Sequence, residues 1–186
     1  MAVTQILQRF LSRSLARPLI WLRSALPILR MALLGSLLTT VLVSCSREQQ
    51  SIEFDVATED GRFFSADYQD KVVYLDFWAT WCAPCRASFP WMNEMREKYK
   101  KEGLQIVAVS IDADRVLARR FATELGARFE VGYDPEGKVA DLFDVNVMPT
   151  SVILGKGGTL IEVHKGFNEA KKEAYENAIV AALKTL

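Results

Sequence analysis

The chain has 186 residues, with 23 basic and 23 acidic side chains, so its formal net charge is zero. This balance conceals a split, because residues 1–44 contain five arginines and no acid, whereas residues 45–186 carry a net charge of −5. The acidic part lacks the basic excess that would neutralise phosphates, which argues against nucleic-acid binding. Half of the residues are hydrophobic, so a disordered chain is also excluded, and residues 45–186 suffice for one domain.

The N-terminal part has the layout of a secretory signal peptide. An apolar run at residues 31–43 follows the arginine-rich stretch, and it is shorter than the roughly 20 residues that span a bilayer as a helix. The sequence Leu-Val-Ser-Cys that ends at Cys45 resembles the bacterial lipobox, in which the chain is cut before a cysteine whose thiol is then lipidated. We expect residues 1–44 to be a lipoprotein signal peptide and Cys45 the lipidation site. The alternative is an uncleaved signal anchor with an inert Cys45.

Export fixes the environment of the rest of the chain. Residues 45–51 are polar and are expected to form a lipid-anchored tether for a domain at 52–186. The expected location is the bacterial cell envelope, facing the periplasm and anchored to the inner or the outer membrane. An oxidising periplasm permits disulfides, and with Cys45 lipidated the two remaining cysteines, Cys82 and Cys85, form one pair.

Hydrophobic patterning predicts strands that alternate with helices, followed by a hairpin and a last helix. Strands are expected at 52–56, 62–64, 72–77, 104–111, 129–133, 151–154 and 160–164, and helices at 84–102, 114–125, 138–143 and 170–186. The second of these helices is expected to face the core with Val116, Leu117, Phe121 and Leu125. This order predicts an α/β fold, a central mixed sheet with helices on both faces.

The most informative motif is Cys82-Ala83-Pro84-Cys85, which follows a predicted buried strand and opens a predicted helix. A helix N-terminus stabilises a thiolate through its unpaired N–H groups and its partial positive charge. In this context the motif indicates dithiol–disulfide chemistry, with Cys82 attacking and Cys85 resolving the mixed disulfide. Zinc would need about four ligands, and only His164 could join the two cysteines, so neither a metal nor another cofactor is expected.

The segment from Asp76 to Arg86, Asp-Phe-Trp-Ala-Thr-Trp-Cys-Ala-Pro-Cys-Arg, resembles the thioredoxin active site. Val-Met-Pro-Thr at 147–150 resembles the cis-proline loop of that superfamily. With the export signal, the N-terminal strands and the extra strand–helix material around residues 112–133, the chain resembles the TlpA/ResA-like branch of membrane-tethered thioredoxins. The resemblance implies a thioredoxin fold with an N-terminal β extension and a central insertion, and thiol–disulfide oxidoreductase activity.

The resemblance also implies roles for residues around the cysteines. Pro149 is expected to be cis and to present the backbone of Met148 to a substrate strand. Trp81, Ala83 and Pro84 are expected to form the rest of the substrate surface. Two neighbours are given ordinary structural roles: Trp78 packs in the core, and His164 is a hairpin residue.

Asp76 is the third residue expected to act in catalysis. A carboxyl group in an apolar strand is costly to bury in its ionised form, so its pKa should be raised. In thioredoxins an acid at this place lies behind the resolving cysteine and exchanges protons during disulfide exchange. The alternative is a solvated Asp at the end of its strand. Members that serve cytochrome c maturation usually have Asn here and Glu three residues after the second cysteine, where this chain has Ser88, which argues against that role.

The expected function is a thiol–disulfide oxidoreductase that reduces disulfides of exported proteins. Its partners would be those substrates, the membrane that holds the lipid, and a membrane electron donor of the disulfide-relay type. A peroxiredoxin-type peroxidase is a second possibility, although Thr80 stands two rather than three residues before Cys82. A copper chaperone of the Sco type is a third, although its cysteines are spaced one residue further apart.

Overall fold

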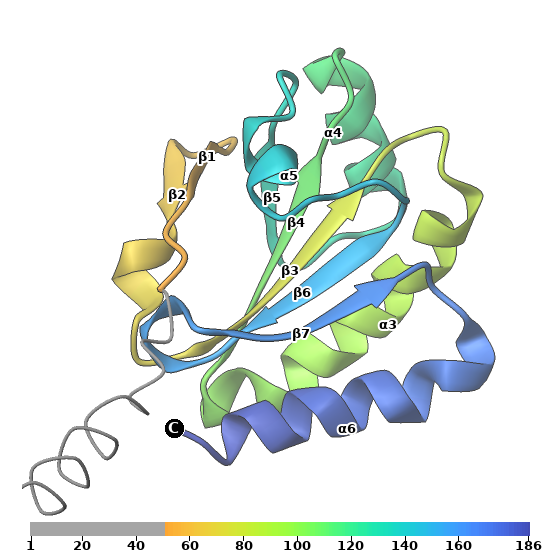
Figure 1. Ribbon diagram of the computed structural model, residues 1–186. Helices are drawn as coiled ribbons and strands as arrows, with labels where there is room; N and C mark the ends of the chain where they lie inside the picture. Colours follow the sequence, from red (N-terminus) through yellow and green to blue (C-terminus); the bar gives the residue numbers. More distant parts are fainter. Residues whose placement is uncertain (1–50) are drawn as a thin grey trace, which may run out of the picture. The chain divides into compact units, whose positions relative to one another are not determined.

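The computed structural model describes residues 51–186, which fall in one compact unit that spans Gln49–Leu186 (Figure 1). The signal-peptide segment, Cys45 and all but the last residue of the tether lie outside the described residues. Within residues 51–186 no helix is long and apolar enough to cross a membrane.

A seven-stranded mixed sheet forms the centre of the fold, with the strand order β2-β1-β5-β4-β3-β6-β7. The three central strands β5, β4 and β3 run parallel, whereas β6 and β7 form an antiparallel hairpin beside β3, and β1 and β2 pair antiparallel beside β5. The strands are β1 (Asp55–Ala57), β2 (Arg62–Phe64), β3 (Val72–Trp78), β4 (Leu104–Ser110), β5 (Glu130–Tyr133), β6 (Thr150–Leu154) and β7 (Leu160–Lys165).

Helices cover both faces of this sheet, as the sequence predicts. One face packs against α3, α4 and α6, and the other packs against α5 and the N-terminal segment. The helices are α3 (Ala83–Tyr99), α4 (Arg115–Glu124), α5 (Lys138–Leu142) and α6 (Lys172–Leu183), and short 3-10 turns occur at Ser65–Tyr68, Lys100–Glu102, Lys156–Gly158 and Glu169–Lys171. Every residue of β3 is buried because both of its faces are covered, which explains its almost continuous apolar sequence.

The first predicted strand begins later than expected. Residues 52–54 lie outside β1, and the backbone N–H of Ile52 donates to the carbonyl oxygen of Gly158 at 3.0 Å. Ser51 makes an isolated bridge with Thr159, so this end of the described chain runs beside the turn between β6 and β7. A side chain at Gly158 would meet the Ile52 carbonyl at 2.8 Å, so this close approach requires a glycine.

The predicted inner side of α4 is partly wrong. Val116 and Leu117 are about half exposed, whereas Phe121 packs in the core together with two alanines, Ala118 and Ala122. Asp114 caps the helix, because the backbone N–H groups of Val116 and Leu117 both donate to its Oδ1 in the first turn. The inner stripe therefore consists of small residues around one large aromatic ring.

Candidate active site

The two cysteines of the motif are joined in a disulfide at the start of α3. Cys82 is the N-cap of the helix, and its Sγ accepts a hydrogen bond from the backbone N–H of Cys85 at 3.2 Å. Pro84 lies in the first turn, where a missing N–H costs nothing. A sulfur at the N-cap faces the positive end of the helix dipole, so this position stabilises the Cys82 thiolate after reduction.

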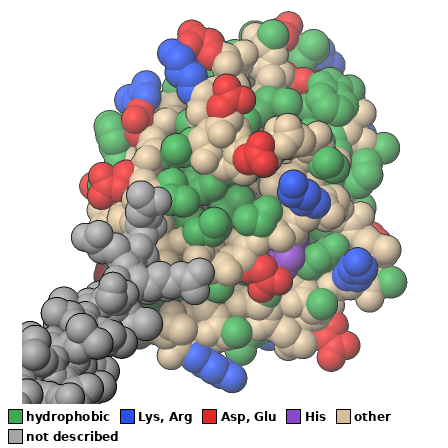
Figure 2. Space-filling model, viewed as in Figure 1, with side chains coloured by type: hydrophobic (Ala, Val, Ile, Leu, Met, Phe, Trp, Pro, Cys, Tyr) green, Lys and Arg blue, Asp and Glu red, His purple; other side chains and the backbone are tan. Residues whose placement is uncertain are grey.

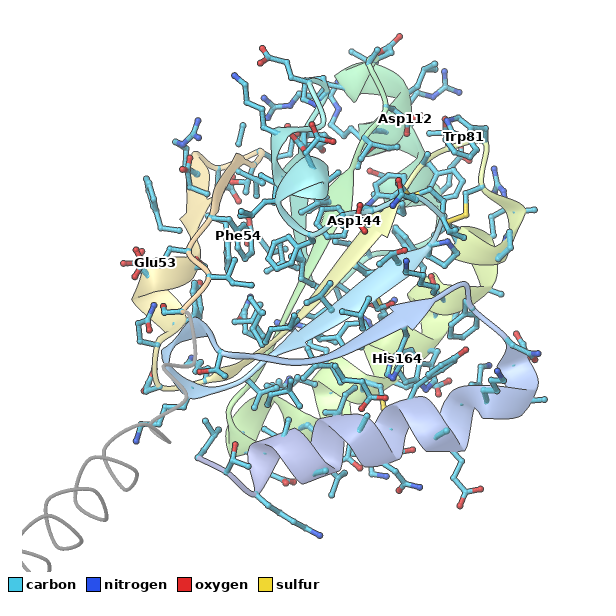
Figure 3. All side chains as sticks on the ribbon, in the orientation of Figure 1. Glu53, Phe54, Trp81, Asp112, Asp144 and His164 are labelled. Atoms are coloured by element: carbon cyan, nitrogen blue, oxygen red, sulfur yellow. A yellow bond between two sulfur atoms is a disulfide. The ribbon has the colours of Figure 1, made fainter. Side chains whose placement is uncertain are left out.

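The residues around the disulfide differ in their exposure to solvent. Cys85 is fully buried and Cys82 is 4% exposed, whereas Trp81 is 69% exposed and Ala83 and Pro84 are also exposed. Figure 3 shows Trp81 at the end of the sheet that carries the disulfide. Cys82 is thus the sulfur that an incoming group reaches first, and an exposed indole lies next to it.

The loop before β6 lies at the same end of the sheet. Thr150 in β6 pairs with Phe77 near the end of β3, so Pro149 lies beside the segment that leads to Cys82. The Met148–Pro149 peptide bond is cis, as expected. Pro149 is buried and its carbonyl oxygen accepts a hydrogen bond from Gly166 N–H at 2.7 Å, while Met148 is partly buried. Gly166 has a φ of +79°, so turn geometry accounts for this glycine.

Asp76 is fully buried in β3, which excludes the solvated alternative. Its neighbours two residues away, Tyr74 and Trp78, belong to the apolar cluster on the α3 side, which also contains Cys85. Side chains alternate along a strand, so Asp76 points to that same side. Burial raises its pKa to about 7, although a 2.6 Å hydrogen bond from Ser151 Oγ to Oδ1 opposes the shift. Within the described part of the chain, its Oδ2 has no hydrogen-bond partner.

Asp112, which follows β4, belongs to no recognisable motif in the sequence. Its Oδ2 accepts the backbone N–H of Thr80 at 2.8 Å and its Oδ1 accepts the Thr80 hydroxyl at 3.0 Å. Ser110 Oγ donates to Oδ2 at 2.9 Å. Thr80 follows β3 and Asp112 follows β4, and these two strands are parallel neighbours. Because the carboxyl ends of parallel strands lie at the same end of a sheet, the predicted strands alone could have indicated that the two loops lie close together. The Thr80 hydroxyl is therefore occupied and does not serve Cys82 as a peroxidase threonine would.

A hollow of about 270 Å³ lies between α4 and the segment from Thr80 to Arg86, which contains both cysteines and is called the redox loop below. The Arg86 guanidinium lies 4.4 Å from the ring centre of Phe121, and both residues line this hollow. Its lining residues are Thr80, Arg86, Leu117, Arg120, Phe121 and Glu124. The exposed position of Leu117, which contradicts the predicted core role, thus places an apolar side chain beside the redox loop.

Comparison with known proteins decides the family. The family model described as Redoxin matches residues 44–179. The chain belongs to the Redoxin family. The thioredoxin fold implied by the motif and the cis-proline loop is confirmed by this match and by the solved structures below.

Among relatives of this Redoxin member are thiol-disulfide oxidoreductases ResA. That of Oceanobacillus iheyensis is 39% identical over 101 residues, which are 54% of this chain and 53% of the relative. That of Bacillus subtilis is 32% identical over 123 residues, 66% of this chain and 69% of the relative. For the first of these the match spans about half of the relative's length.

Solved structures cover more of their own length. A Chlorobium tepidum protein assigned as thiol:disulfide interchange protein DsbE has a TM-score of 0.70 and 44% identity, covering 73% of this chain and 96% of that one. The pneumococcal exposed lipoprotein thioredoxin Etrx1 of Streptococcus pneumoniae has a TM-score of 0.61 and 29% identity, covering 73% of this chain and all of that one. The match to a TlpA/ResA-like oxidoreductase expected from the sequence is confirmed.

Among residues 51–186 no group of three or more His, Cys, Asp or Glu side chains is placed to hold a metal ion. His164 Nε2 lies 2.8 Å from Glu162 Oε1, on β7. Trp78 is fully buried and stacks on Phe121 with ring centres 5.1 Å apart, which agrees with its expected core role.

Proposed function

We propose that this protein is a thiol–disulfide oxidoreductase that reduces disulfides in exported proteins through Cys82 and Cys85. The observation that carries the proposal is the Cys82–Cys85 disulfide at the start of α3, with the cis-proline loop beside it and a buried carboxyl group on its inner side. The ResA and DsbE relatives, whose names state thiol–disulfide chemistry, support it.

The reaction begins from the dithiol form. The Cys82 thiolate attacks one sulfur of the substrate disulfide, which forms a mixed disulfide and releases one substrate thiolate. Cys85 then loses its proton to the Asp76 carboxylate and attacks Cys82 Sγ, so the second substrate thiolate leaves. The substrate gains two electrons and takes up two protons, and the enzyme ends as the disulfide seen in the structure.

Asp76 suits this second step because its pKa of about 7 lies close to the working pH. A carboxylate in an apolar surrounding is a stronger base than one in water, so it can take the proton of a buried thiol. Cys85 itself is fully buried and cannot give its proton directly to solvent.

Substrate contact is assigned to the exposed residues around Cys82. Trp81, Ala83 and Pro84 offer an apolar surface, and the backbone of Met148 offers hydrogen-bonding groups to an extended substrate segment. Pro149, which has no backbone N–H, holds Met148 just before the start of β6. Tryptophan is enriched among the residues that contribute most to binding energy at interfaces.

The location and the donor complete the proposal. Cleavage before Cys45 and lipidation of its thiol would hold the domain at a membrane with its disulfide in the periplasm. The likeness to a solved exposed lipoprotein thioredoxin supports this arrangement. Reduction of the enzyme disulfide then requires two electrons from a dithiol on a membrane protein of the disulfide-relay type.

The proposal is tested with a disulfide-containing protein substrate and dithiothreitol as reductant. The wild-type protein should accelerate reduction, and Cys82→Ser should abolish the acceleration. Reduced Cys85→Ser, incubated with the substrate after dithiothreitol has been removed, should accumulate a mixed disulfide with it. Cys45→Ser serves as the matched control and should keep full activity. Acceleration that survives in Cys82→Ser would contradict the proposal.

A further inference from the structure

A row of polar side chains crosses three neighbouring strands on the α6 side of the sheet. Asp76 in β3 is paired in register with Ser151 in β6, and Ser151 is paired with His164 in β7. Side chains that are directly opposite in paired strands point to the same face. The row therefore runs from the buried centre of the sheet to its edge strand, where His164 lies beside α6 (Figure 3).

The two ends of this row differ in their access to water. Asp76 is fully buried, whereas the side chain of His164 is 13% exposed and that of Glu162 is 49% exposed. The chain's one histidine, purple in Figure 2, reaches the surface. Its Nε2 lies 2.8 Å from Glu162 Oε1, so this nitrogen faces the solvent side.

Two buried polar atoms along the row have no hydrogen-bond partner among residues 51–186: Oδ2 of Asp76 and Nδ1 of His164. Ser151 lies between them and donates to the other carboxylate oxygen, Oδ1, at 2.6 Å. Leaving buried polar atoms unpaired costs free energy, and such atoms often mark a functional site. The Cβ atoms of opposed residues are about 4.5–5.5 Å apart, so a rotated Ser151 hydroxyl can reach the imidazole of His164.

Two tyrosines also face the row. The ring of Tyr175 in α6 lies 4.9 Å from the imidazole, and Tyr74 in β3 lies near Asp76 and is hydrogen-bonded to Ser151. Burial raises the pKa of Tyr74 well above its usual value. The β4 residue opposite Asp76 is Ala108, which has no polar side chain. Cys85 on α3 is the source of the proton.

We propose that Ser151 and His164 carry the proton between Asp76 and solvent during each reaction cycle. This inference rests on the proposed function. The Asp76 carboxyl gives its proton to Ser151 Oγ, Ser151 passes its own proton to His164 Nδ1, and Nε2 releases one to Glu162 or to water. Only O–H and N–H bonds form and break, and Asp76 returns to its ionised state. A hydroxyl and an imidazole suit this role because each can accept one proton and donate another.

The test follows reduction of the Cys82–Cys85 disulfide by dithiothreitol between pH 5.5 and 8.5, monitored by tryptophan fluorescence. In this direction Cys85 leaves as a thiolate and takes its proton from Asp76, which must then be reprotonated through the same row. His164→Ala should slow the reaction at pH 7 by about tenfold, less than the usual loss of a general acid because water replaces the ring in part. Added imidazole should restore the rate, and Ser151→Ala should show the same slowing without rescue.

Val163→Ala is the matched control, since it shortens a half-exposed side chain on the opposite face of the same strand, and it should leave the rate unchanged. An unchanged rate in His164→Ala, or a loss that imidazole does not restore in a variant with a native circular dichroism spectrum, overturns the proposed route. Such a result leaves the proposed function intact as long as the wild-type protein still reduces a protein disulfide. A wild-type protein that reduces none overturns that function instead.

Discussion

Asp112 holds Thr80 by two hydrogen bonds, one to the backbone N–H at 2.8 Å and one to the hydroxyl at 3.0 Å. Thr80 stands two residues before Cys82, whose own N–H donates to the carbonyl oxygen of Ala79 at 3.1 Å. The end of β4 thus fixes the loop that carries the attacking sulfur. Asp112 is a positioning residue, because it acts on Cys82 through Thr80.

Asp112→Ala should lower the free energy of unfolding by about 2 kcal/mol, since it removes hydrogen bonds to a charged group. It should also change the rate at which iodoacetamide alkylates reduced Cys82, because the loop becomes looser. Asp112→Asn keeps one acceptor for the Thr80 N–H, so its free energy of unfolding and its Cys82 alkylation rate should both lie close to those of the wild type. Loss of stability with an unchanged alkylation rate would show that Asp112 supports the fold alone.

Asp76 should make the protein less stable as the pH rises. Its folded-state pKa is about 7 and its reference value is 3.8, so between these values the folded state holds a proton that the unfolded state has lost. The free energy of unfolding therefore falls as the pH rises from about 4 to about 7, and is constant above that. Asp76→Asn should exceed the wild type in stability by up to about 4 kcal/mol at pH 8 and by little at pH 3.5. Urea unfolding of the oxidised proteins measures this difference, and equal pH dependence in both would contradict it.

Ser151→Ala should raise the pKa of Asp76 above its present value of about 7. The Ser151 hydroxyl donates to the ionised carboxylate at 2.6 Å and lowers that pKa, so its loss leaves only the effect of burial. Titration of the Asp76 carboxyl carbon by NMR measures the change directly. Thr150→Ala, on the same strand, is the control, and a lower Asp76 pKa in Ser151→Ala would refute the assignment.

Trp81→Ala should weaken substrate binding without affecting the fold. The side chain is 69% exposed, so its removal should leave the free energy of unfolding within about 0.5 kcal/mol of the wild type. The KM for a protein disulfide should rise about tenfold with a nearly constant kcat, since truncating a contact aromatic often costs more than 1 kcal/mol. Leu142→Ala, at a 52% exposed position on α5, should change neither constant. Equal KM values for Trp81→Ala and wild type would remove Trp81 from the substrate surface.

The features that the sequence predicts correctly are those that depend on local sequence patterns. Buried strands such as β3 appear as continuous apolar runs, and the motif that begins at Cys82 contains its own helix start. The raised pKa of Asp76 follows from the same local argument, because an acid inside such a run must be buried. These features depend on neighbours along the chain.

The remaining features depend on contacts that distant segments make. The hydrogen bonds of Asp112 to Thr80 and of Ser151 to Asp76 require the loop geometry and the register of paired strands, which periodicity does not specify. The orientation of α4 depends on the core contacts of Ala118, Phe121 and Ala122. These contacts leave Val116 exposed, where the sequence pattern predicts a core position. The buried alanines Ala118 and Ala122 add little to a hydrophobic pattern, whereas the exposed Val116 and Leu117 add much to it. The pattern therefore predicts the wrong inner face for part of α4.

The reduction potential of the Cys82–Cys85 pair tests the central claim most directly. It is measured by equilibrating the protein with glutathione or dithiothreitol buffers of known ratio and quantifying the two free thiols. A reductase of exported proteins should have a potential of about −270 mV, where the disulfide form is favoured and the dithiol gives up its electrons readily. A value of about −120 mV would contradict the account, because a protein with that potential oxidises its substrates.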